Sequence, residues 1–96
     1  MDYDIYFPSN LENVNVSNDN VDVCIRFEDG REYCIVVITP ENLAELMKNS
    51  HRPYILPDFK FLVVQTITKE NIHQLIRTMI EDKYLLEFYG SDTLGE

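Results

Sequence analysis

Residues 21–37 read VDVCIRFEDGREYCIVV, and this stretch decides the fold. Apolar and polar residues alternate on both sides of Glu28-Asp29-Gly30, a pattern that predicts two β-strands joined by a tight turn. A two-residue turn would mix charged residues into the apolar face. A three-residue loop with Gly30 in the left-handed conformation pairs Ile25 with Tyr33 and keeps that face apolar. We therefore predict a hairpin with a three-residue loop.

The same register places Cys24 opposite Cys34 on the second face of the hairpin. Three interpretations are open: a cross-strand disulfide, two ligands of a metal site, or two small thiols on a half-covered sheet face. A zinc site needs about four ligands, and neither His51 nor His73 has a spacing that brings it close. A reducing compartment also disfavours a disulfide. We expect reduced thiols and no metal.

Two helices and two further strands are predicted around the hairpin. Residues 4–7 form a short strand, and residues 60–67 form a strand with both faces buried. Thr39-Pro40 opens a first helix that ends near Asn49, because Thr is a good N-cap and Pro suits the first helical position. Thr68 opens a second helix in the same way. Its apolar residues follow the spacing of a core-facing helix, at Ile72, Leu75, Ile76, Met79 and Ile80.

The expected fold class is α+β. We predict a mainly antiparallel sheet of four or five strands in the order β-β-β-α-β-α, with two helices packed on one face. The 96 residues suit a single domain, residues 1–96, in which residues 91–96 form a flexible tail. Periodicity does not decide whether residues 84–89 are helical or extended.

The charge of the chain is −9 and is concentrated at its two ends. Residues 1–32 hold eight acids and two bases, residues 33–80 hold four and five, and residues 81–96 hold five and one. Such a field repels nucleic acid and anionic lipid and attracts cationic partners. The chain has no apolar run long enough for a membrane span and no signal-peptide pattern at its start, so we expect a cytoplasmic protein.

No residue pattern points to catalysis. The three glycines do not form a phosphate-binding loop, and no serine lies in a nucleophile elbow. The acidic pairs Glu28-Asp29 and Glu81-Asp82 lie at a turn and at a helix end, and the sequence gives no evidence for the cleft and the defined carboxylate separation that glycoside hydrolysis requires. We expect no enzyme, no catalytic residue and no cofactor.

The composition instead favours a surface that binds a basic protein. Acidic side chains supply steering charge, and tyrosines in loops and near the chain ends supply anchors. The candidate partner-binding residues are Asp22, Glu28, Asp29, Glu32, Tyr54, Glu81, Asp82, Tyr84, Glu87 and Tyr89.

The strand-turn-strand around Phe27–Tyr33, the helix start Thr39-Pro40-Glu41-Asn42-Leu43, the strand Phe61–Ile67 and the helix start Thr68–Ile72 together resemble small immunity proteins of polymorphic toxin and contact-dependent inhibition systems. The resemblance implies a non-enzymatic inhibitor that occludes a toxin domain, often a basic nuclease.

An alternative hypothesis is a homodimeric structural or regulatory module. The second sheet face is too apolar for a fully solvated surface and requires a cover. Its residues are Cys24, Cys34, Val36 and Ile38.

Overall fold

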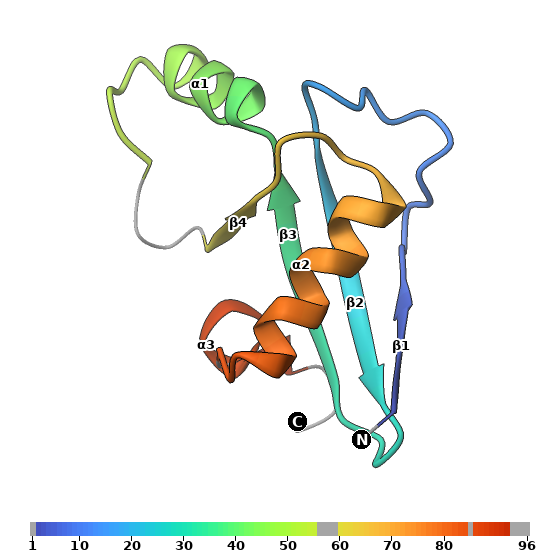
Figure 1. The fold of residues 1–96 in the computed structure, drawn as a ribbon. Helices are drawn as coiled ribbons and strands as arrows, with labels where there is room; N and C mark the ends of the chain where they lie inside the picture. Colours follow the sequence, from blue (N-terminus) through green and yellow to red (C-terminus); the bar gives the residue numbers. More distant parts are fainter. Residues whose placement is uncertain (1, 56–59, 85, 93–96) are drawn as a thin grey trace.

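The computed structural model describes residues 2–55, 60–84 and 86–92 (Figure 1). Its elements are, in chain order, β1 (Tyr3–Tyr6), β2 (Asn20–Phe27), β3 (Glu32–Ile38), α1 (Pro40–Asn49), β4 (Phe61–Val63), α2 (Lys69–Glu81), α3 (Leu86–Tyr89) and β5 (Ser91–Asp92). The α+β class and the predicted element order are confirmed. The predicted tail begins with β5, and residues 93–96 lie outside the described residues.

The sheet is mixed. Its strands follow the order β1-β2-β3-β4, and β5 pairs with β3 on the same side as β4. The pairs β1–β2, β2–β3 and β3–β5 are antiparallel, whereas β3–β4 is parallel. The expectation of a mainly antiparallel sheet therefore needs one correction. Between β3 and β4 the chain contains α1 and the segment that follows it, and a connection of this length lets the second strand run parallel to the first.

The hairpin register is confirmed. Cys24 lies opposite Cys34 and Ile25 opposite Tyr33. The N–H of Phe27 donates to the carbonyl of Arg31 at 2.8 Å, and the N–H of Gly30 donates to the carbonyl of Phe27 at 3.0 Å. Gly30 has φ +96°, a region that side chains with a Cβ rarely occupy. The three-residue loop therefore depends on glycine at this position.

Replacing Gly30 by alanine is expected to lower the free energy of unfolding by about 1–2 kcal/mol. The cost is conformational, because a Cβ added at Gly30 would meet no atom within 4 Å. Gly30→Asn should lose less, since asparagine tolerates the left-handed region better. Urea unfolding of the two variants measures the difference. Equal losses for alanine and asparagine would contradict this explanation.

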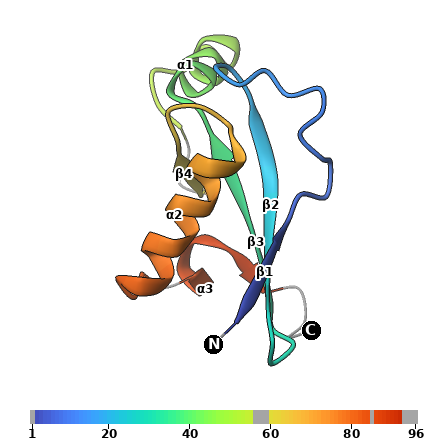
Figure 2. The same cartoon turned by 45° about the vertical axis from the view of Figure 1, so that its right-hand side comes forward.

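The main core lies between α2 and one face of the sheet. Ile72, Ile76 and Met79 of α2 are buried, as the predicted apolar stripe requires. They join a cluster that includes Val23 and Ile25 of β2. Figure 1 shows α2 crossing the sheet, and Figure 2 shows α2 and α3 on the same side of it. This packing fixes the orientation of the hairpin relative to the helix.

Helix α1 lies beyond the end of β3 rather than over the sheet face (Figures 1 and 2). Thr39 is its N-cap and accepts a hydrogen bond from the N–H of Asn42 at 3.3 Å, as predicted. None of its residues is fully buried. The expected packing of both long helices on one face therefore holds for α2 only, because α1 lacks the broad apolar stripe that would cover a sheet.

Strand β4 is shorter and more exposed than predicted. Only Phe61–Val63 pair with β3, and Val63 is 50% exposed. The expectation of a strand over residues 60–67 buried on both faces was wrong. β4 lies at the edge of the sheet, and the described helices cover only one face of that sheet. The chain then turns inward, where the N–H of Val64 donates to the carbonyl of Ile38 at 3.0 Å and Val64 and Ile67 are buried.

Within the ranges that the structure describes, none of the helices is both long and apolar enough to cross a bilayer.

Candidate functional site

The fold brings the two acidic ends of the sequence to one end of the sheet, which we call the hairpin end (residues 2–4, 28–32 and 91–92). β1 begins beside the end of β2, where Tyr3 lies opposite Phe27. The N–H of Glu28 donates to the carbonyl of Asp2 at 3.0 Å. On the other side of the hairpin, β5 places Asp92 opposite Tyr33. The N-terminus, the turn and the last strand therefore meet at the lower end of Figure 1.

Two arginines neutralise part of this acidic charge. Arg26 Nη2 lies 3.1 Å from Glu32 Oε2, and Arg31 Nε lies 2.8 Å from Asp29 Oδ2. Among the other acids of the hairpin end, Asp2, Asp4 and Glu28 are exposed. They form no ion pair with any other described residue. The hairpin end therefore keeps a net negative charge.

The turn pair is held by the backbone as well as by charge. The backbone N–H of Arg31 donates to the Asp29 carboxylate at 3.0 Å, and this bond together with the Arg31 guanidinium holds the pKa of Asp29 below its usual value. The same carboxylate raises the pKa of Arg31. Asp29, a predicted partner-binding residue, is thus already engaged in shaping the turn.

A pocket of about 320 Å³ lies between the start of β1 and the turn. Its lining residues are Asp2, Tyr3, Asp4, Arg26, Phe27, Glu28 and Gly30. The pocket thus places these three acids beside Arg26 and beside Tyr3, whose ring centroid lies 6.0 Å from that of the buried Phe27. Sequence analysis named Glu28 but missed Asp2 and Asp4, because it did not establish which strand pairs with β1. The alternation of Tyr3, Ile5 and Phe7 with polar residues was the signal that this strand has one core face.

The predicted acids on α2 lie apart from this pocket. Glu81 ends α2 and Asp82 is its C-cap, and both are exposed. α2 lies on one side of the sheet and ends toward the same lower part of the molecule as the hairpin (Figures 1 and 2). The last turn of α2 has no basic residue to offset the negative end of its dipole. These acids therefore extend the negative field without joining the pocket.

The remaining predicted residues are dispersed. Tyr54 follows α1 in the chain and is exposed, and Tyr84 is exposed after α2. Tyr89 is half-buried, packs against the core and contacts the ring of Phe88, an exposed aromatic that sequence analysis did not name. Asp22 is exposed near the start of β2, on the face opposite α2. Glu87 is in α3. No single surface therefore contains all the predicted residues.

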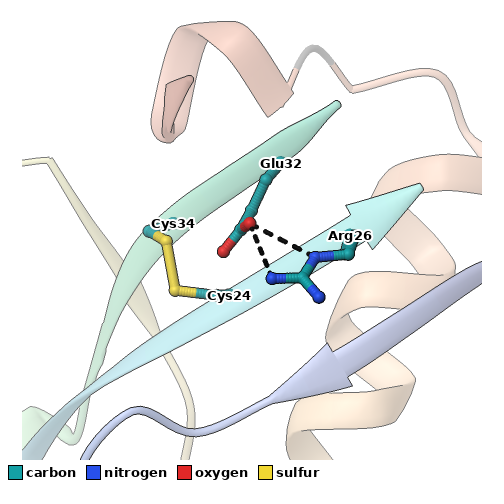
Figure 3. A network of polar contacts seen from close by, with 4 residues as sticks. All are labelled: Cys24, Arg26, Glu32 and Cys34. Atoms are coloured by element: carbon teal, nitrogen blue, oxygen red, sulfur yellow. Dashed lines mark hydrogen bonds and ion pairs between the residues drawn. A yellow bond between two sulfur atoms is a disulfide. The ribbon is translucent and has the colours of Figure 1, made fainter. Parts of the chain in front are cut away.

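The two cysteines form a disulfide, which corrects the expectation of free thiols (Figure 3). Their Cα atoms are 4.1 Å apart, within the close spacing of directly opposed residues in an antiparallel pair. Glu32 lies beside them. Its Oε2 accepts two hydrogen bonds from Arg26, one from Nε at 3.3 Å and one from Nη2 at 3.1 Å. Glu32 is only 6% exposed, so this predicted partner-binding residue is largely covered.

The predicted dimer face is only partly accessible. Cys24, Cys34, Val36 and Ile38 share the sheet face opposite α2. Cys24 and Ile38 are buried, although neither belongs to the α2 core, whereas Cys34 and Val36 are half-buried. Their neighbours Tyr6 and Val63 are the more exposed apolar side chains of this face.

Comparison with known proteins gives no assignment: no family model, no curated protein and no solved structure matches this chain.

Proposed function

We propose that this protein binds a basic protein domain through its hairpin end and neutralises it, as an immunity protein neutralises a toxin. The observation that carries the proposal is the meeting of both acidic chain ends at the hairpin, where three carboxylates that pair with no described basic residue line one pocket. The function is occlusion, so it needs no reaction by this chain. We place it in the cytoplasm, a compartment whose reductants would open the Cys24–Cys34 disulfide.

Physical chemistry supports a cationic ligand for the pocket. Lys and Arg side chains combine a long apolar stem with a charged head. In the pocket, the half-buried Tyr3 would contact the stem, and Asp2, Asp4 and Glu28 would accept hydrogen bonds from the head. The surrounding negative field would raise the association rate, most strongly at low salt. A basic nuclease domain carries such side chains for its own phosphate contacts.

The proposal is tested with the polypeptide encoded next to this one. Immunity proteins of this kind are expected beside a large secreted protein with a toxic C-terminal domain, and that domain is the partner to produce. We expect it to be basic, to form a complex with this chain, and to stop killing cells when this chain is co-produced. Association should slow steeply as salt rises.

Two results of this experiment would contradict the proposal. No complex, or a complex whose association rate does not change with ionic strength, would rule the proposal out. Light scattering of this chain alone tests the alternative function. A stable dimer that Val36→Lys dissociates would favour the self-associating module, an idea supported by the absence of a helix over that face of the described fold.

A further inference from the structure

We propose that Cys24, Cys34 and Glu32 form a redox-gated binding site for a zinc-class divalent cation. In the oxidised protein the disulfide closes the site. In the reduced protein the two thiolates and the carboxylate supply three ligands. This inference is independent of the proposed partner-binding function.

The hairpin register brings the three donors together. Cys24 and Cys34 are directly opposed, and Glu32 precedes Cys34 by two residues, so all three side chains emerge on the same face. One donor atom from each lies within 4.8 Å of the other two. Zn²⁺ binds carboxylate oxygen at about 2.0–2.2 Å and thiolate sulfur at about 2.3 Å. Once the disulfide opens, side-chain rotations would bring the three donor atoms to these distances from one cation. A fourth position stays available for water, as in zinc sites with three protein ligands.

The carboxylate is already positioned as a ligand. Both hydrogen bonds from Arg26 go to Oε2 of Glu32. Oε1 accepts no hydrogen bond from a described residue and points toward the two sulfur atoms (Figure 3). Metal-ligating groups are commonly held by a second hydrogen-bonding residue of this kind. Arg26 therefore acts as a positioning residue for Glu32.

The charges of the site also suit a divalent cation. Two thiolates and one carboxylate carry three negative charges, and Zn²⁺ with the Arg26 guanidinium carries three positive charges. The site is therefore neutral when it is filled, which matters because Cys24 and Glu32 are buried. Thiolate ligands select zinc-class ions over Mg²⁺ and Ca²⁺, which prefer oxygen ligands only.

The redox step is an ordinary thiol–disulfide exchange. A dithiol reductant transfers two electrons to the Cys24–Cys34 bond, and its own two thiols become a disulfide. Two protein thiols result. Each loses its proton to solvent as its sulfur binds the cation. Oxidation reverses the sequence and expels the cation, so metal binding reports the redox state of the compartment.

The test uses Co²⁺ as a spectroscopic probe and Zn²⁺ as its competitor. The full chain is reduced with a phosphine under anaerobic conditions and titrated with Co²⁺. We expect one Co²⁺ per chain, a thiolate-to-cobalt charge-transfer absorption, displacement by Zn²⁺, and no binding to the oxidised protein. Glu32→Gln should weaken Co²⁺ binding by at least about 10-fold. Loss of a residue that only hydrogen-bonds to a metal ligand already weakens binding by about 10-fold or more, and Glu32 is itself a proposed ligand. Glu28→Gln is the matched control in the same hairpin and should bind as the wild type does.

Three outcomes would overturn the proposal. The first is a folded, reduced protein without the charge-transfer absorption. The second is equal Co²⁺ affinity in Glu32→Gln and Glu28→Gln, when circular dichroism shows both to be folded. The third is a reduced chain that unfolds and that Co²⁺ does not refold, because a cation that binds only the native state must stabilise it.

Discussion

Replacing Ile76 by alanine is expected to lower the free energy of unfolding by about 2–5 kcal/mol. Ile76 is fully buried in the middle of α2, inside the cluster that joins this helix to the sheet. The substitution removes apolar surface and leaves a cavity that the surrounding side chains fill only in part. For a domain of this size the total stability is about 5–15 kcal/mol, so the variant approaches the limit of folding. Urea unfolding followed by circular dichroism measures the loss.

Two controls separate packing from helix formation. Ile76→Val removes one methylene and should cost about 0.5–1.5 kcal/mol. Gln74→Ala changes an exposed position of the same helix and should leave stability within about 0.5 kcal/mol. If Ile76→Ala costs no more than Gln74→Ala, α2 does not pack on the sheet as described.

Reduction of the Cys24–Cys34 disulfide is expected to lower the free energy of unfolding by about 2–4 kcal/mol when metal is excluded by a chelator. The bond joins residues with a sequence separation of 10, and it restricts the unfolded chain more than the folded hairpin, in which the two strands are already paired. The measurement compares denaturant midpoints of the wild type with and without reductant. A reducing compartment would therefore remove this contribution of the disulfide to the free energy of unfolding.

The matched variant for this experiment is the double substitution Cys24→Ala/Cys34→Ala. Its midpoint should not respond to reductant, which shows that no other group is affected. A wild-type midpoint that also fails to respond would mean that the disulfide does not contribute to the stability of this fold.

Local sequence chemistry predicted the hairpin and both long helices. Gly30 specifies the loop because the left-handed conformation excludes most other residues, and the loop then fixes the partner of each strand residue. Thr39 and Thr68 mark the helix starts because their side chains accept backbone hydrogen bonds there. These features depend on neighbours within a few residues, so the sequence contains them directly.

The errors concern contacts between distant segments. Phe61-Leu62-Val63 resembles a strand buried on both faces, but its exposure depends on its place at the sheet edge, which the run itself does not encode. The partner of β1 was not identifiable either, and the acidic pocket depends on that partner. The cysteines were correctly placed opposite each other, yet their redox state was inferred from an expected compartment rather than from their geometry. The sequence therefore indicated that the candidate site is acidic, but it did not indicate where on the fold the acidic residues meet.

The most direct test of the central claim is the association rate with the basic domain encoded next to this chain. Asp2→Asn/Asp4→Asn/Glu28→Gln removes the three pocket carboxylates and keeps the side-chain shapes. Glu12→Gln/Glu41→Gln/Glu70→Gln removes the same charge from exposed positions away from the hairpin end. At low ionic strength we predict that the first variant associates at least about 10-fold more slowly than the wild type. The second should change the rate much less, and equal rates for the two variants would contradict the hairpin end as the binding surface.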